Sequence, residues 1–191
     1  MIVDRIINLA IEYDVIAKEE ERIYHVAITS LFFSAITWGT LLVFSIYFQK
    51  QLPSLVFLLF HIPLRVFAGG FHQPTRTRCY IQSLVMFTVL MFGATSQLYY
   101  WVVNHCIIIL PFSVAIFVLS PVAASNKPLS DKEYSRYRFT TRIILVLELA
   151  CMFFFKMLEM NDFLYFAAIS TVIVSIQVII AKKPSLLKYE A

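Results

Sequence analysis

Charged residues are scarce in this chain. Only 15% of its 191 residues are Asp, Glu, Lys or Arg, whereas 60% are hydrophobic, and the mean hydropathy is +0.76. A soluble domain of this size cannot cover so much apolar surface with so few polar groups, so the composition indicates an integral membrane protein. The net charge is only +4, and the basic residues lie at the ends of apolar runs. Nucleic acid is therefore not expected as a partner.

Motifs for metals and cofactors are also missing. The sequence has no phosphate-binding glycine loop, no paired acids at metal-ligand spacing and no HExxH motif, so no ATP, zinc or other cofactor is expected. The three cysteines show neither zinc spacing nor a disulfide framework. Cys106 and Cys151 lie in apolar runs, as small core or lipid-facing residues do.

The apolar runs predict an all-α, polytopic membrane protein in a single domain over residues 1–191. A spanning helix needs about 20 apolar residues, and about six such helices are expected, followed by a tail over 182–191. The second run is short and the fourth contains Pro111, so some helices are expected to be short or broken. The expected spans cover residues 25–48, 52–67, 80–100, 102–120, 143–160 and 163–181.

Residues 1–22 form a different kind of element. Apolar residues recur there at steps of three and four, from Ile2 through Ile6 and Leu9 to Tyr13, while acidic residues such as Glu12 fall elsewhere. This pattern predicts an amphipathic helix lying in the membrane interface. Docking of a partner helix on the same surface stays open as an alternative.

The basic residues predict the orientation. With the N-terminus inside and all six spans formed, every Lys and Arg except Lys50 and Lys156 falls on the cytoplasmic side. Short loops with an excess of Lys and Arg face the cytoplasm. Both termini and the junction between the second and third spans, residues 65–79, are therefore expected there.

That junction reads RVFAGGFHQPTRTRC and concentrates polar chemistry between two apolar runs. Cys79 and His72 are the parts of a thiol nucleophile with its base. In one continuous helix they would be about 10 Å apart along the axis, too far for a hydrogen bond. Pro74 favours a helix start at its own position, so a turn over 69–73 would let His72 fold back through Gly69 and Gly70. From spacing alone, a structural role at the interface stays open.

Other polar residues complete the candidate site. Arg76 and Arg78, with the helix N-terminus, would favour the reactive thiolate of Cys79. Arg65 ends an apolar run beside the turn, where it either binds a carboxylate or oxyanion or reaches out to the interface. Glu148 lies inside the fifth expected span, and an ionisable group at that depth suggests function. It would orient His72, pair with an arginine of another span, or stay protonated or solvated.

The junction resembles the signature of the AgrB family, membrane endopeptidases that process quorum-sensing propeptides in Gram-positive bacteria. The basic loop over residues 120–138, with its run Asn126-Lys127-Pro128-Leu129, resembles the second marked region of that family. Chain length, number of spans and position of the junction agree as well, so the similarity covers nearly the whole chain.

The resemblance implies a cysteine endopeptidase in the cell membrane, with Cys79 as nucleophile, His72 as base and a cytoplasmic active site. The substrate would be an AgrD-like propeptide with an amphipathic leader, a signal segment and an acidic tail. Cleavage would form an acyl-thioester, and a cysteine or serine of the signal segment would close a thiolactone or lactone. No metal is expected. The supporting residues expected around the dyad are Arg65, Gly69, Gly70, Gln73, Arg76, Arg78, Asn126, Lys127, Pro128 and Glu148.

Further expectations concern partners. A basic rim that includes Arg136, Arg138 and Arg142 would hold the acidic tail, although each arginine also suits a cytoplasmic anchor. A homodimer in the lipid bilayer is favoured, because small membrane enzymes with broken helices often pair. Two other classes stay open. One is a small transporter or channel subunit with Arg65, His61 and Glu148 lining a pathway, and the other is a non-enzymatic scaffold.

Overall fold

The computed structural model describes residues 2–13, 15–70, 75–122 and 129–187. Within these ranges the regular structure is helical, which confirms the predicted all-α class. The α-helices are α1 (Ile2–Glu12), α2 (Glu21–Tyr47), α3 (Gln51–Ala68), α4 (Arg76–Ala94), α5 (Gln97–Asn104), α6 (Ile109–Leu119), α7 (Asp131–Met157) and α8 (Asn161–Leu187). Two short 3₁₀ helices, η1 (Lys18–Glu20) and η2 (Cys106–Ile108), precede α2 and α6.

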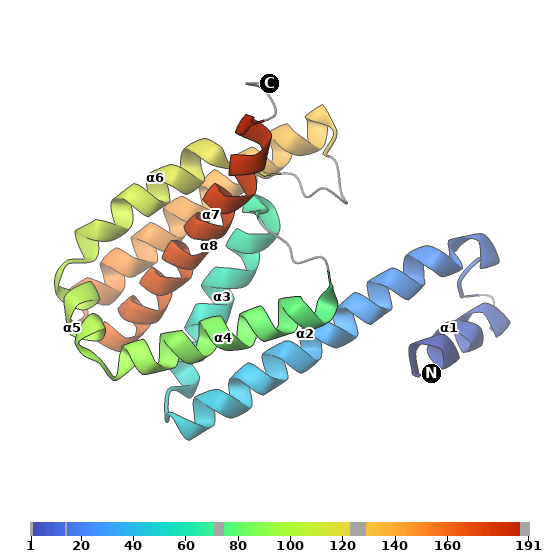
Figure 1. The fold of residues 1–191 in the computed structure, drawn as a ribbon, viewed down its shortest axis with the longest axis horizontal. Helices are drawn as coiled ribbons and strands as arrows, with labels where there is room; N and C mark the ends of the chain where they lie inside the picture. Colours follow the sequence, from blue (N-terminus) through green and yellow to red (C-terminus); the bar gives the residue numbers. More distant parts are fainter. Residues whose placement is uncertain (1, 14, 71–74, 123–128, 188–191) are drawn as a thin grey trace.

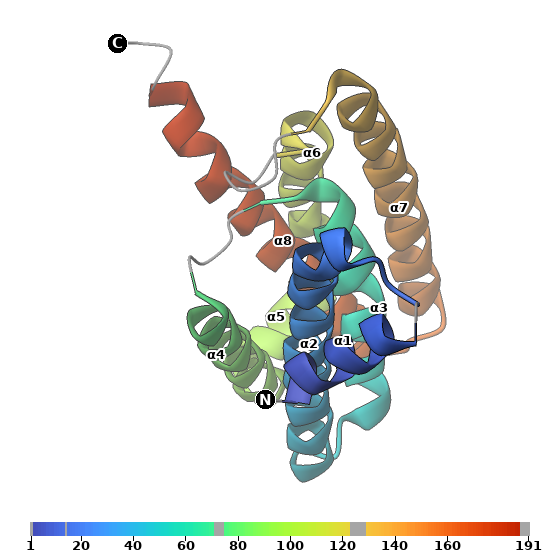
Figure 2. The ribbon, with the colours of Figure 1, turned by 90° about the vertical axis from the view of Figure 1, so that its right-hand side faces the viewer.

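Helix α8 lies at the centre of the molecule and packs against α3, α6 and α7 (Figures 1 and 2). Small residues along α8, including Ala167, Ala168 and Thr171, are completely buried. Small side chains allow helix backbones to approach closely, which is how membrane helices gain packing energy in the absence of a hydrophobic driving force between them. Most of the buried core therefore surrounds one helix.

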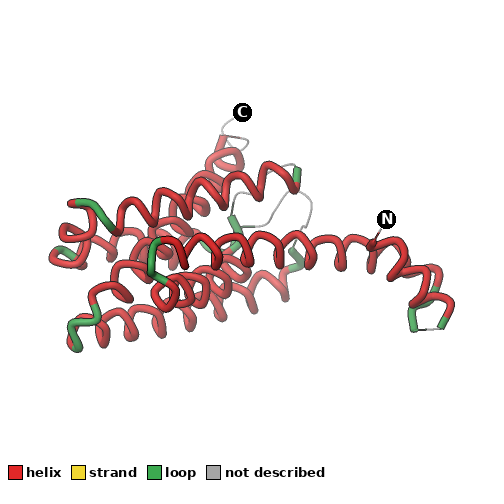
Figure 3. Tube along the Cα trace, turned by 90° about the horizontal axis from the view of Figure 1, so that it is seen from below, coloured by secondary structure: helices red, strands yellow, loops and turns green. Residues whose placement is uncertain are grey.

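Helices α2 and α4 form a second layer beside this bundle (Figure 1). Phe87 of α4 packs on Phe44 of α2 and on Phe57 of α3, with ring centroids 6.4 and 6.0 Å apart. Tyr165 of α8 donates a hydrogen bond to the carbonyl of Leu90 in α4, at 3.3 Å. The long helices lie roughly side by side, and their connections gather at the two ends (Figure 3).

Four helical segments are long and apolar enough to cross a membrane, and the bent pair formed by α5 with η2 and α6 would make a fifth. The chain is thus a polytopic membrane protein, as predicted. The fifth expected span, over 143–160, falls in α7, which does not meet the same test. Its apolar part carries Arg142, Glu148 and Lys156, and these charges lower the apolarity of any stretch of spanning length. The four segments are Lys18–Tyr47, Gln51–Ala68, Thr77–Ala94 and Asn161–Lys182.

The boundary between the third and fourth expected spans lies earlier than predicted. Helix α4 ends at Ala94 rather than at residue 100, and Ser96 caps α5 by accepting a hydrogen bond from the backbone of Leu98 at 3.3 Å. After α5 the axis turns by 83° into η2 and α6. The residues around this boundary are apolar or uncharged, so the hydropathy pattern carries no mark of the two breaks.

Lys50 and Lys156, the two lysines that the sequence predicts to lie away from the cytoplasmic side, are both found at one end of the bundle. Lys50, between α2 and α3, pairs with Asp162 at the start of α8, with a Nζ–Oδ2 distance of 2.5 Å. Lys156, in the last turn of α7, donates to the carbonyl oxygen of Val103 in α5 at 3.0 Å. The junction between α3 and α4 lies at the opposite end (Figure 1).

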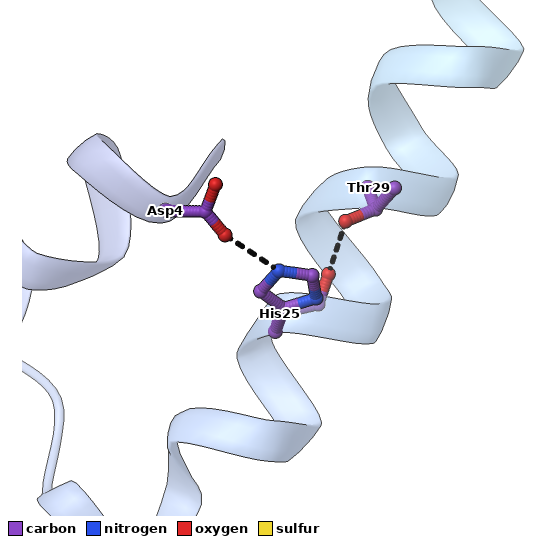
Figure 4. Close-up of polar contacts among 3 residues, drawn as sticks. All are labelled: Asp4, His25 and Thr29. Atoms are coloured by element: carbon purple, nitrogen blue, oxygen red, sulfur yellow. Dashed lines mark hydrogen bonds and ion pairs between the residues drawn. The ribbon is translucent and has the colours of Figure 1, made fainter. Parts of the chain in front are cut away.

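Helix α1 folds back against the start of α2. Ile7 is 1% exposed, whereas its neighbour Ile6 is 47% exposed, so one apolar face of α1 is buried and the rest is not. Asp4 accepts a hydrogen bond from Nε2 of His25 at 3.1 Å, and the hydroxyl of Thr29 donates to the backbone carbonyl of His25 at 2.6 Å (Figure 4). The predicted stripe, with Ile6, Leu9 and Tyr13 exposed at 47%, 46% and 76%, is therefore not the face that packs on α2, and its position in the membrane interface stays a prediction.

Candidate active site

Cys79 lies in the first turn of α4 and is exposed. The hydroxyl of Thr75 caps the helix by accepting a hydrogen bond from the backbone of Arg78 at 3.3 Å, and the backbone N–H of Cys79 donates to the carbonyl of Thr75 at 3.1 Å. The helix begins at Arg76, two residues after the predicted start at Pro74. The amino end of a helix carries partial positive charge and favours an anion, which suits a thiolate.

Arg65 lies in the last turn of α3 and is half-buried. Its guanidinium donates a hydrogen bond to the carbonyl of Gly69, one of the carbonyls that a helix end leaves without an internal partner. The same guanidinium lies within electrostatic range of the Cys79 side chain. Arg65 thus holds the end of α3 and contributes positive charge within electrostatic range of the nucleophile candidate.

The two glycines of the junction are both required by its backbone. Gly69 and Gly70 have φ angles of +71° and +120°, a region that side chains with a Cβ rarely adopt. A Cβ on Gly69 would overlap the carbonyl oxygen of Val122. A Cβ on Gly70 would lie 2.7 Å from Nη1 of Arg65 and 3.2 Å from the backbone oxygen of Gln177 in α8. The chain therefore passes here through a space that admits only glycine.

The junction is tied to the segment that begins the basic loop. Gly69 and Val122 form an isolated parallel bridge, and the backbone N–H of Val122 donates to the carbonyl of Ala68 at 3.0 Å. Phe67 of α3 also meets Tyr137 of α7 edge to face, with ring centroids 5.5 Å apart. The two regions that carry the family resemblance are thus adjacent in space, although about 50 residues separate them.

Several predicted site residues lie outside the described ranges. His72 and Gln73 fall in the gap at 71–74, and Asn126, Lys127 and Pro128 fall in the gap at 123–128. The pairing of His72 with Cys79 therefore stays a prediction. The first gap begins after Gly70 and the second after Val122, so both begin at or next to the bridge between Gly69 and Val122.

The predicted basic rim is only partly presented to solvent. Arg78 and Arg136 are exposed, whereas Arg138 and Arg142 are half-buried. The guanidinium of Arg142 lies over the ring of Phe117, 4.3 Å from its centroid, as a cation–π contact. The structure does not describe the side chain of Arg76. Among the described side chains of the predicted rim, Arg78 and Arg136 are thus the ones open to an acidic ligand.

Glu148 lies on α7 and is 6% exposed. Neither carboxylate oxygen has a hydrogen-bond partner among the described residues, so no arginine pairs with it there. His61 on α3 stacks on Phe57 with ring centroids 5.1 Å apart, and its Nδ1 is buried and also without a partner in the described part of the chain. Both residues are packed in the helix bundle, and His61 lies about one turn of α3 before Arg65.

Sequence reasoning overlooked a pair of glutamines. Gln177 on α8 is 8% exposed, and its Nε2 approaches Sδ of Met86 on α4 at 3.7 Å. Gln82 on α4 approaches the same sulfur at 3.7 Å. The signal that would have found Gln177 is an amide inside the apolar run STVIVSIQVIIA, where polar residues are costly and often functional.

Within the described residues, no three His, Cys, Asp or Glu side chains come together as a metal site would require. The arrangement offers an exposed thiol at a helix start, a half-buried guanidinium beside it and a glycine turn held against a second segment. These parts suit acyl transfer through sulfur.

The family model described as AgrB, accessory gene regulator B, matches residues 3–181. No curated protein and no solved structure matches the chain.

Proposed function

Because the chain belongs to the AgrB family, whose members process AgrD propeptides, we propose that it is a membrane cysteine endopeptidase that uses Cys79 as its nucleophile. The observation that carries this proposal is the position of Cys79. The thiol is exposed in the first turn of α4, within electrostatic range of Arg65, at a junction held against the segment of the second marked region.

In the first chemical step, the thiolate of Cys79 attacks the carbonyl carbon that joins the signal segment to the C-terminal tail. The C–N bond breaks, and His72 gives a proton to the departing amine of the tail. The signal segment remains attached to the enzyme as an acyl-thioester. Arg65, whose guanidinium is already aimed at the carbonyl of Gly69, would stabilise the negative charge that develops on the attacked oxygen.

In the second step, a thiol or hydroxyl of the signal segment attacks the thioester carbon. The new C–S or C–O bond closes a thiolactone or lactone, and the sulfur of Cys79 leaves and recovers a proton. When one thioester is exchanged for another, the free energy of the reaction is close to zero. Removal of the tail or of the cyclic product therefore has to draw the thiolactone reaction forward.

We also propose that the active site faces the cytoplasm. Lys50 and Lys156 are both engaged at the far end of the bundle, whereas Arg78 and Arg136 are exposed at the junction end. This distribution agrees with an excess of basic residues on the cytoplasmic side. Such an orientation suits a peptide made in the cytosol, and Arg78 and Arg136 would attract its acidic tail. The homodimer stays a prediction.

The test uses the purified full-length protein in proteoliposomes with a synthetic AgrD-like propeptide. Wild-type protein should release the tail and form an enzyme adduct that hydroxylamine removes, as intact mass spectrometry would record. Cys79→Ala should lower tail release at least about a thousandfold, whereas Cys106→Ala, at a cysteine in η2, should retain it. Tail release by Cys79→Ala at the wild-type rate would disprove the proposal.

The transporter or channel alternative has one structural observation in its favour. Glu148 and His61 each keep a buried polar atom without a hydrogen-bond partner in the described part of the chain, as groups that line a pathway would. The same variants separate the two functions. Substitution of Cys79 should leave transport unaffected, because Cys79 lies outside such a pathway at the start of α4.

A further inference from the structure

Two amide groups converge on one sulfur between α4 and α8. Nε2 of Gln82 and Nε2 of Gln177 each lie 3.7 Å from Sδ of Met86. A thioether is a weak hydrogen-bond acceptor, so these donors gain less here than they would from a carbonyl oxygen. The site holds, in Gln177, a buried donor that a stronger acceptor would attract.

The side chain of Gln177 also has a hydrogen-bond acceptor that is not used in the described part of the chain. Its Oε1 is buried and has no hydrogen-bond partner in the described part of the chain, although the residue is only 8% exposed. A buried amide oxygen without a partner costs free energy of folding. A ligand that supplies the missing donor would remove this cost.

The amides lie about one to two turns of α4 from the nucleophile and close to the junction. Cys79, Gln82 and Met86 follow one another at steps of three and four residues, which places them on one face of α4. From Cys79 to Met86 the helix rises by about 10 Å, which an extended peptide covers with about three residues. The backbone of Gln177 lies directly against Gly70 of the junction.

We propose that Gln177, together with Gln82, binds the backbone of the peptide on the acyl side of the scissile bond, about three residues before it. Oε1 of Gln177 accepts a hydrogen bond from a backbone N–H of the peptide, and the two Nε2 groups exchange the sulfur of Met86 for a peptide carbonyl. The inference rests on the proposed peptidase function and adds a substrate subsite to it.

The depth of the site in the membrane favours the signal segment over the acidic tail as the part of the peptide that binds there. From Cys79 the α4 face runs into the apolar layer, away from the exposed Arg78, and an acidic tail would not enter it. A backbone inside that layer must find hydrogen-bond partners within the protein. The retained signal segment, once bound there, would have one N–H and one C=O group satisfied by the two amides.

The test combines enzyme variants with modified peptides. Propeptides carrying a single N-methyl group at the second, third or fourth residue before the scissile bond lose one backbone N–H each. With the wild-type enzyme, one of these peptides should show KM raised about tenfold, with kcat much less affected, because a buried hydrogen bond is lost. With Gln177→Leu, the KM of the unmodified peptide should rise by a similar factor and N-methylation should add almost nothing.

Controls separate this subsite from folding and from the peptidase function itself. Gln97→Leu, an exposed glutamine at the start of α5, should behave as wild type with every peptide. If Gln177→Leu fails to fold in detergent, Gln177→Met and Gln82→Leu carry the same comparison. An N-methylation penalty equal in wild type and Gln177 variants would overturn the inference while leaving the peptidase intact. Processing by Cys79→Ala would instead remove the proposed function.

Discussion

Gly69 and Gly39 differ in whether the surrounding structure requires a glycine. Gly69 has a positive φ and its missing Cβ leaves room for the carbonyl of Val122, whereas a Cβ on Gly39 in α2 would meet nothing within 4 Å. The space around Gly69 is therefore a requirement of the junction. Gly39 only gives α2 backbone freedom that a helix does not need.

We expect Gly69→Ala to lower the free energy of unfolding by about 2 kcal/mol or more, because the substitution adds backbone strain and a clash with Val122. Gly39→Ala, the matched control, should raise it by about 0.5–1 kcal/mol, since alanine favours the helix. Thermal unfolding in detergent, followed by size-exclusion chromatography, would measure both. Equal stability of the two variants would contradict the described bridge between Gly69 and Val122.

At Glu148, a buried carboxyl without a partner predicts a gain in stability on removal. Glu148→Leu should raise the free energy of unfolding by about 1–3 kcal/mol, because the cost of burying an unpaired polar group disappears. Glu148→Gln, which keeps a polar head, should raise it less. Denaturation in detergent by the same chromatographic assay would show the order. A Glu148→Leu variant less stable than wild type would indicate a partner that the described residues do not include.

Among the elements, helices were predictable and their breaks were not. Runs of apolar residues place α2, α3 and α8 within a few residues of the expected spans, because the length of such a run reflects the thickness of the membrane. The end of α4 at Ala94 and the 83° turn after α5 were missed. They depend on Ser96 as a cap and on tertiary packing, neither of which changes hydropathy.

Helix α1 should be held to α2 by apolar contact more than by its ion pair. Ile7 is 1% exposed and Ile6 is 47% exposed, so Ile7→Asp should release α1 and Ile6→Asp should not. Hydrogen exchange of the α1 amides in detergent would report the release. Asp4→Asn, which removes the exposed contact with His25 (Figure 4), should change the exchange only slightly. Release by Asp4→Asn alone would reverse this ranking.

Over the whole molecule, the two ends of the bundle differ in their basic residues, and the proposed orientation follows from that difference. In a chain with Cys106 and Cys151 replaced by Ala, a membrane-impermeant maleimide should label Cys79 only when the cytoplasmic face is accessible, as in inverted vesicles. Tyr47→Cys, at an 81% exposed position in the last turn of α2 at the other end, placed in a chain without other cysteines, should be labelled from outside cells. The reverse pattern would refute the orientation.

The candidate site shows how far sequence reasoning reaches. Cys79, Arg65 and the glycine pair were identifiable because polar residues and glycines stand out in an apolar junction. The bridge from Gly69 to Val122 and the approach of Gln177 to Met86 join residues about 50 and 90 positions apart. Contacts of that separation depend on how the helices pack, and one sequence carries no direct record of them.

The central place of α8 bears on how the protein is made. A ribosome delivers α3, α6 and α7 to the membrane before α8, yet α8 is the helix around which all three pack. During synthesis the earlier helices must wait in lipid with their inner faces uncovered, and the junction, whose Gly70 rests on Gln177, lacks that contact until the last helix arrives. A nascent chain would therefore carry Cys79 long before it carries the fully packed junction.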